Sequence, residues 1–131
     1  MTRSQILFGL DGRLARLAYF NYVVFANIII LMAMLAAYFL LLASKPLGIA
    51  AIACGAIAFL WMGVALGVKR LHDMGWSGKH MAWIVAINVV AILTSNVHVG
   101  LALVTGLANL AVLLWLLFAP GDADDNAYGL A

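Results

Sequence analysis

Hydrophobic residues form four long runs along this chain of 131 residues, and short polar segments separate them. An apolar helix of about 20 residues, rising about 1.5 Å per residue, crosses the ~30 Å hydrocarbon core of a bilayer. The pattern therefore predicts an all-α, polytopic membrane protein that forms a single transmembrane domain over residues 1–131. The four predicted transmembrane helices cover residues 17–42, 47–68, 80–94 and 97–118.

The polar segments predict where these helices begin and end. Residues 1–16 are mixed and basic, which is typical of an interfacial segment and not of a cleavable signal peptide. Ser44-Lys45-Pro46 closes the first run and opens the second, because proline is tolerated in the first turn of a helix. Ser95-Asn96 separates the last two runs. Pro120 stops the fourth run, and residues 120–131 then form an acidic tail.

The third run is shorter than an ordinary crossing, since residues 80–94 extend only about 22 Å at the helical rise. A three-span alternative fuses the last two runs, but the fused segment would be far longer than a bilayer requires. In the second run, Gly63 and Gly67 lie four residues apart. Such spacing of small residues predicts a close helix–helix contact, either within the molecule or in a homodimer.

Composition agrees with a membrane protein and excludes several classes. Hydrophobic residues make up 67% of the chain, charged residues only 9%, and the mean hydropathy is +1.12. About 25% of residues are charged in ordinary soluble domains. The formal net charge of +2 is too small to indicate nucleic-acid binding. The single cysteine, Cys54, lies in an apolar run, so neither a disulfide nor a reactive thiolate is expected.

The basic residues predict the orientation. Four crossings place both termini and the central polar segment on one side of the membrane. That side then carries six basic residues, against Lys45 alone on the other: Arg3, Arg13, Arg16, Lys69, Arg70 and Lys79. Because positively charged loops stay in the cytoplasm, we expect the N- and C-termini to be cytoplasmic.

Three motifs stand out against the apolar background. They are Gly12-Arg13-Leu14-Ala15-Arg16 before Tyr19-Phe20, then the stretch from Lys69-Arg70-Leu71-His72-Asp73 to Ser77-Gly78, and finally Pro120-Gly121 with Asn126-Ala127-Tyr128-Gly129. Together they resemble domain of unknown function 805, a family of small bacterial inner-membrane proteins. The resemblance implies a multi-pass protein of the bacterial inner membrane and implies no activity. Lys69 stands where the family usually has a second arginine, and Lys79-His80 where an aromatic residue commonly follows Ser-Gly.

All three motifs are predicted to face the cytoplasm, where they could form a site for an anion. Arginine forks and turn amides suit phosphate oxygens, and basic clusters at this membrane face bind anionic lipid headgroups. Alternatively, the same charges reach the interface and only set the topology. The candidate ligand-binding residues are Arg13, Arg16, Lys69, Arg70, His72, Asp73, Ser77, Gly78, Asn126 and Tyr128.

Two structural predictions follow from the same motifs. If the second helix continues through His72, the carboxylate of Asp73 can pair with both Lys69 and Arg70, which lie four and three residues away. Arg70, His72 and Asp73 should then act as one electrostatic unit. The acidic tail should fold back under the bundle, because it shares a membrane face with six basic residues, so that Asn126 and Tyr128 contact the first or second motif.

Other chemistries are less well supported. His72, Asp73 and Ser77 are the residue types of a nucleophilic triad, but residues so close in sequence rarely converge and no oxyanion hole is identifiable. Asp122-x-Asp124-x-Asn126 imitates the opening of a calcium loop, yet Ala127 replaces the required glycine. We therefore predict no catalytic residue, no metal site and no cofactor.

The leading hypothesis is a non-enzymatic membrane module that binds an anionic ligand, either a lipid headgroup or phosphate, or else a partner protein. The expected partners are the lipid bilayer, an anionic lipid, and a membrane protein or a second copy of the chain, but not nucleic acid. The alternative is a small transporter or channel subunit, because four helices in about 130 residues is the size of a small multidrug exporter protomer. Cation-coupled export generally needs an acid within the bilayer, and every aspartate here lies outside the predicted spans.

Overall fold

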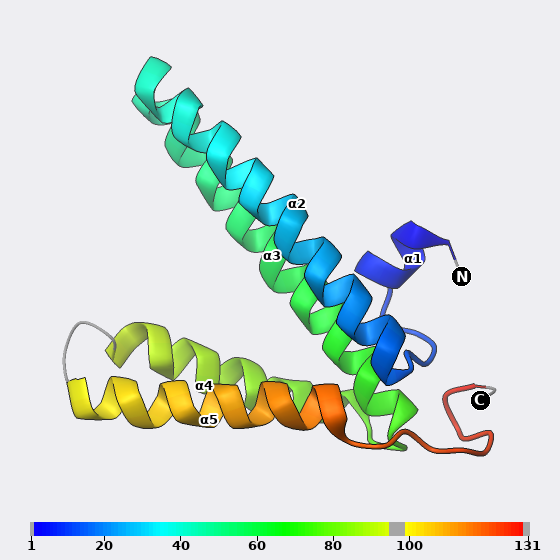
Figure 1. The fold of residues 1–131 in the computed structure, drawn as a ribbon. Coiled ribbons are helices and arrows are strands. Elements are labelled where there is room, and N and C mark those ends of the chain that lie inside the picture. Colours follow the sequence, from blue (N-terminus) through cyan, green and yellow to red (C-terminus); the bar gives the residue numbers. More distant parts are fainter. Residues whose placement is uncertain (1, 95–98, 130–131) are drawn as a thin grey trace.

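A computed structural model describes residues 2–94 and 99–129, and within these ranges the protein is helical and contains no strand (Figure 1). This confirms the all-α prediction. The predicted break at Ser95-Asn96 and the first two residues of the predicted helix 97–118 lie outside the described residues. The elements are α1 (Arg3–Phe8), α2 (Arg16–Ala43), α3 (Lys45–Asp73), the 3-10 helix η1 (Gly78–His80), α4 (Met81–Thr94) and α5 (Val99–Phe118).

The four long helices form two antiparallel hairpins, α2 with α3 and α4 with α5 (Figure 1). Both hairpins start from a common end of the molecule and diverge away from it. The two termini and α1 also lie at this end (Figure 1). Ser44 alone joins α2 to α3, and the turn is so tight that a Cβ added at Gly48 would overlap with Leu41.

Three of the helices are long and apolar enough to cross a membrane: α2 with 28 residues, α3 with 29 and α5 with 20. The apolar stretch formed by η1 and most of α4, Gly78–Leu93, is shorter. Large apolar side chains are exposed along all of these helices, for example Leu31 on α2 and Ile57 on α3. In water such surfaces would drive aggregation, whereas lipid accommodates them. The fold is therefore that of a membrane protein.

Helix α3 extends beyond its predicted end at Val68 and continues to Asp73. The prediction was wrong because it treated the polar residues as loop, although lysine and arginine are good helix formers. The side chains of Lys69 and Arg70 are buried there, and each finds oxygen acceptors. The helix stops at Met74, and Gly75 then adopts a left-handed φ of 74°, a common way to terminate a helix.

The core is concentrated at the end where the hairpins meet. Its buried members come from α1, α2, α3 and α5 and from the segments that follow α1 and α3: Leu7, Leu14, Tyr19, Ala26, Met62, Leu66, Leu71, Met74 and Leu116. The rest of each hairpin is held by the contact between its own two helices. The common end is therefore the part of the molecule that packs like an ordinary protein interior.

Glycines explain part of this packing. A Cβ at Gly67 would collide with Met81 at the start of α4, and one at Gly55 would collide with Met34 of α2. A Cβ at Gly63 would meet nothing within 4 Å. The predicted intramolecular contact is thus confirmed for Gly67 and is wrong for Gly63, which faces away from the neighbouring helices.

Candidate functional site

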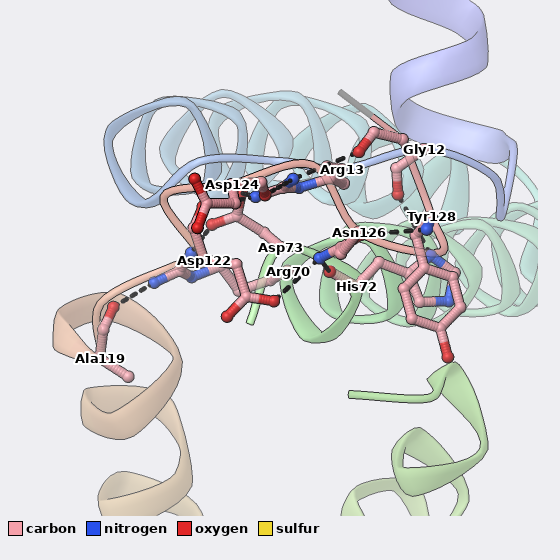
Figure 2. A network of polar contacts seen from close by, with 11 residues as sticks. Gly12, Arg13, Arg70, His72, Asp73, Ala119, Asp122, Asp124, Asn126 and Tyr128 are labelled. Atoms are coloured by element: carbon pink, nitrogen blue, oxygen red, sulfur yellow. Dashed lines mark hydrogen bonds and ion pairs between the residues drawn. The ribbon is translucent and has the colours of Figure 1, made fainter. Parts of the chain in front are cut away.

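The three sequence motifs meet at the common end of the hairpins (Figure 2). We call their meeting point the motif cluster and define it by Gly12, Arg13, Arg70, His72, Asp73, Asp122, Asp124, Asn126 and Tyr128. The second motif lies in the last turns of α3, the first in the segment before α2, and the third in the tail after α5. Residues more than a hundred positions apart are therefore in direct contact.

Arg70 joins α3 to α5. Its side chain is fully buried, and its Nε donates to the carbonyl oxygen of Leu116 at 2.7 Å. Its Nη atoms donate to the carbonyl oxygen of Ala119 and to Oδ2 of Asp73. The last carbonyl groups of a helix have no partner within the helix and attract cations. Arg70 thus caps the C-terminal end of α5 from a neighbouring helix.

Asp73 is the counter-charge of two arginines. Besides Arg70, its carboxylate pairs with Arg13, whose Nη2 lies 3.5 Å from Oδ1. The side chains of Arg13 and Asp73 are only 5% and 10% exposed. Asp73 does pair with two bases as expected, but the second is Arg13 and not Lys69. Helical spacing suggested the wrong partner, because Arg13 comes from a segment distant in sequence.

Lys69 points to the other side of α3 and fastens the N-terminal segment. Its Nζ donates to the carbonyl oxygens of Ile6 at 3.0 Å, of Gly9, and more weakly of Ala65 at 3.4 Å. Its own carbonyl oxygen accepts a hydrogen bond from the backbone N–H of Leu14. Because Ile6 and Gly9 lie at the end of α1, this buried ammonium caps that short helix and holds it against α3.

Arg13 holds the tail. Its Nη1 donates to the carbonyl oxygens of Asp124 at 2.8 Å and Gly129 at 3.3 Å, and its Nη2 donates to that of Asp122 at 2.6 Å. The backbone N–H of Asp122 donates in turn to the carbonyl oxygen of Asp73 at 2.7 Å. The prediction that the tail folds back is confirmed. Its stated reason is only partly right, since Arg13 binds backbone carbonyls of the tail instead of its carboxylates.

His72 provides a flat surface for the end of the tail (Figure 2). Its ring stacks on Tyr128 with centroids 4.0 Å apart and planes 1° from parallel. Asn126 Nδ2 donates to the carbonyl oxygen of His72 at 2.9 Å. Nδ1 of His72 lies 3.1 Å from the carbonyl oxygen of Gly12, which can only accept, so this nitrogen carries a hydrogen. The predicted contact of Asn126 and Tyr128 with the second motif is confirmed.

The remaining predicted residues lie at the edge. The Ser77 hydroxyl accepts from the backbone N–H of Lys79 and caps η1. Gly78 packs against His72, since a Cβ there would lie 3.2 Å from Nε2. Arg16 is the first residue of α2 and is exposed. Within the described residues, its guanidinium has no hydrogen-bond or ion-pair partner.

Two hollows meet at Arg16. The polar hollow has a volume of about 350 Å³ and is lined by Arg13, Ala15, Arg16, Asp73, Pro120, Gly121 and Asp122. The apolar groove, about 610 Å³, is lined by Arg16, Leu17, Phe20, Leu117 and Phe118. Sequence reasoning missed the apolar members, because nothing in a run of lipid-facing residues marks the few that share a groove. The available signal was the predicted topology, which places the start of the first predicted helix and the end of the last at the same membrane face.

The geometry limits the chemistry. The triad hypothesis fails because Asp73 faces two arginines, His72 Nδ1 faces a carbonyl, and Ser77 accepts from a backbone amide. In the part of the chain that the structure describes, no group of three or more His, Cys, Asp or Glu residues could hold a metal ion. What the site does offer is Arg16, a cation that is unpaired among the described residues and lies between a polar and an apolar surface.

The fold and the motif cluster define a small, all-helical membrane protein in which one polar cluster fastens two apolar hairpins. The chain belongs to the family described as "Protein of unknown function (DUF805)", whose family model matches residues 7–130. The resemblance inferred from the motifs is therefore confirmed. Searches of curated proteins and of solved structures find no match to this chain.

Proposed function

We propose that this is a protein of a bacterial inner membrane with four crossings and with both termini in the cytoplasm. Contacts at the common end support this topology. The first motif, the end of α3 and the tail bind one another there, so each hairpin leaves that face and returns to it. Six of the seven basic residues belong to the segments at this face, and the positive-inside rule assigns it to the cytoplasm.

The proposed crossing formed by η1 and α4 is short, and an aromatic cluster at its start supports the proposal that it begins at the headgroup layer. Gly78–Leu93 extends about 24 Å at the helical rise, so the bilayer thins locally around it. Trp76 packs edge-on against both His80 and Trp115, at centroid distances of 5.1 and 5.8 Å. Aromatic side chains of this kind favour the headgroup layer and anchor helix ends there.

At this face the protein acts as a non-enzymatic module that binds the phosphate of an anionic group, either a lipid headgroup or a free phosphate ester. The observation that carries the proposal is the position of Arg16, which is exposed, unpaired among the described residues, and lines both hollows. A guanidinium at a membrane interface is a strong donor to phosphate oxygens.

The other cations of the motifs contribute less directly. Lys69 and Arg70 are fully buried and donate to protein oxygens, so they hold the scaffold. Arg13 both holds the scaffold and remains partly available to a ligand. Its two Nη atoms bind the tail, while its buried Nε has no partner within the described residues. Of the candidate ligand-binding residues, Arg16 is therefore the one that we propose binds the anion, with Arg13 beside it.

Native mass spectrometry of the detergent-purified protein, titrated with phospholipid, tests the proposal. Arg16→Gln should bind phospholipid about tenfold more weakly, as expected for the loss of one charge-assisted hydrogen bond. Lys79→Gln, which removes another exposed cation of the same face, is the matched control and should bind normally. If Arg16→Gln bound every lipid as tightly as the unmodified protein, the proposal would fail. Displacement of bound lipid by inorganic phosphate would indicate a free phosphate ester as the ligand.

A transporter is the second candidate, and one feature favours it. A hollow of about 300 Å³ between the hairpins is lined by Tyr19, Asn88 and Asn109 among apolar residues. Polar side chains at membrane depth often mark a solute path. Protein-dependent uptake of a small uncharged polar solute such as glycerol into liposomes, lost in Asn109→Leu, would support this function. Uptake equal to that of empty liposomes would reject it.

A further inference from the structure

The polar hollow beside Arg16 carries both signs of charge. Arg13 and Arg16 contribute two positive charges, and Asp73 and Asp122 two negative ones. The carboxylate of Asp73 is neutralised by Arg13 and Arg70. That of Asp122 is exposed, and within the described residues only its Oδ2 accepts a hydrogen bond, from Asn126 Nδ2 at 3.0 Å. One cation and one anion, Arg16 and Asp122, therefore remain available to a ligand.

The fold keeps Asp122 at the hollow. Its backbone N–H donates to the carbonyl oxygen of Asp73, and Arg13 binds its carbonyl oxygen at 2.6 Å. The chain can approach Asp73 so closely only because residue 121 is glycine, since a Cβ there would overlap with the Asp73 carboxylate. The backbone contacts of Asp122 thus hold this acid at the hollow.

The apolar groove continues from Arg16 toward the membrane. Its walls are Leu17 and Phe20 from the first turns of α2, and Leu117 and Phe118 from the last turn of α5. Leu17 is 70% exposed and Phe118 73%. Exposed apolar residues are ordinary on a spanning helix. This groove differs because it begins at an unpaired cation and adjoins a polar hollow, so it matches a molecule with a charged head and an apolar chain.

We infer that the ligand is a phospholipid whose headgroup carries a primary amine, as in the phosphoethanolamine class. Its phosphate binds Arg16, its ammonium group faces Asp122, and one acyl chain lies in the apolar groove. This inference rests on the proposed function and adds the class of headgroup. The phosphodiester carries one negative charge in a glycerol headgroup as in an ethanolamine headgroup. A glycerol headgroup would place only uncharged hydroxyl groups beside Asp122, whereas an ammonium group would be attracted to its carboxylate and could donate hydrogen bonds.

Lipid titration of the full-length protein in detergent, read by native mass spectrometry, tests the inference. The probes are dioleoyl phosphatidylethanolamine, dioleoyl phosphatidylglycerol and water-soluble glycerophosphoethanolamine. The unmodified protein should bind the ethanolamine lipid about tenfold more tightly than the glycerol lipid. The chain-free compound should not compete at equal concentration, because the groove is then unused. Asp122→Asn should abolish the preference between the two lipids while it retains an acceptor for Asn126.

Asp124→Asn is the matched control and should leave the preference unchanged. Among the described residues, Asp124 joins the motif cluster through its backbone carbonyl oxygen, which the variant keeps, and its carboxylate does not line the hollow. Equal binding of the two lipids by the unmodified protein would overturn the inference, and this comparison requires no variant. An unchanged preference in Asp122→Asn would also overturn it. If Arg16→Gln weakened both lipids equally while the unmodified protein showed no preference, the proposed function would stand and only the choice of headgroup would fall.

Discussion

Arg70 and Asp73 show how opposite charges can be buried together at the common end of two apolar hairpins. Each Nη or Nε direction of Arg70 finds an oxygen, and Asp73 is shared between two guanidinium groups. Removing one member of a buried ion pair typically costs about 3 to 5 kcal/mol, because the other charge remains desolvated without a partner. The pair was predictable from its spacing in the sequence. Its full burial was not, because the acceptors at Leu116 and Ala119 are nearly fifty residues away.

The first prediction concerns this pair. Both Arg70→Ala and Asp73→Asn should lower the melting temperature in detergent, and Arg70→Ala should do so more, because it also uncaps α5. The double variant should lose less than the sum of the two single losses, by about 1 to 3 kcal/mol. Thermal unfolding of the four proteins measures the coupling. Lys45→Ala, an exposed charge at the opposite end, should have little effect, and strict additivity of the pair would show that it is not coupled.

At the scale of the elements, the tail is held in place by the stacking of Tyr128 on His72 and by a few hydrogen bonds. The second prediction is that Tyr128→Ala loosens it, whereas Tyr128→Phe does not, because stacking on His72 requires only the ring. Hydrogen exchange of residues 121–129 measures this. Tyr128→Ala should raise the exchange rates and Tyr128→Phe should match the unmodified protein. Equal rates in all three proteins would mean that the stack does not hold the tail.

The α2–α3 hairpin yields a third prediction. Gly48→Ala should destabilise the protein by about 1 to 3 kcal/mol, because the new methyl group overlaps with Leu41. Gly106→Ala on α5 should be neutral or stabilising by up to about 1 kcal/mol, since its Cβ meets nothing within 4 Å and alanine favours a helix. Melting temperatures compare the two. A Gly48→Ala protein as stable as Gly106→Ala would contradict the close approach at the turn.

At the scale of the elements, the sequence predicted the bounds of the helices better than it predicted the contacts of the candidate site. Long apolar runs are strong signals, so α2, α3 and α5 begin and end within a few residues of their predicted bounds, apart from the extension of α3 to Asp73. The charges of Lys69 and Arg70 suggested that the helix had ended before them, but both side chains are buried. The docking of the tail followed from charge and topology. Its contacts did not, since they use backbone carbonyls, which every residue carries and no sequence pattern marks.

At the scale of the whole molecule, both hairpins start from and return to one common end (Figure 1), where the three motifs meet. The proposed topology has each hairpin cross the membrane from this end and return to it. The motif cluster fastens the end of α3, the end of α5 and the tail to one another, and Lys69 of α3 fastens α1 beside them. Arg16 and both hollows lie at that same end. Proposed ligand binding and proposed orientation therefore depend on the same topology.

Cysteine accessibility in intact cells tests that topology most directly. In a background with Cys54→Ala, single cysteines replace Ser44 at the α2–α3 turn, Ser77 after α3, and Ala127 in the tail. A membrane-impermeant maleimide added outside the inner membrane should label Ser44→Cys, and should label Ser77→Cys and Ala127→Cys only after the membrane is opened. Labelling of Ser77→Cys or Ala127→Cys from outside in intact cells would contradict the account.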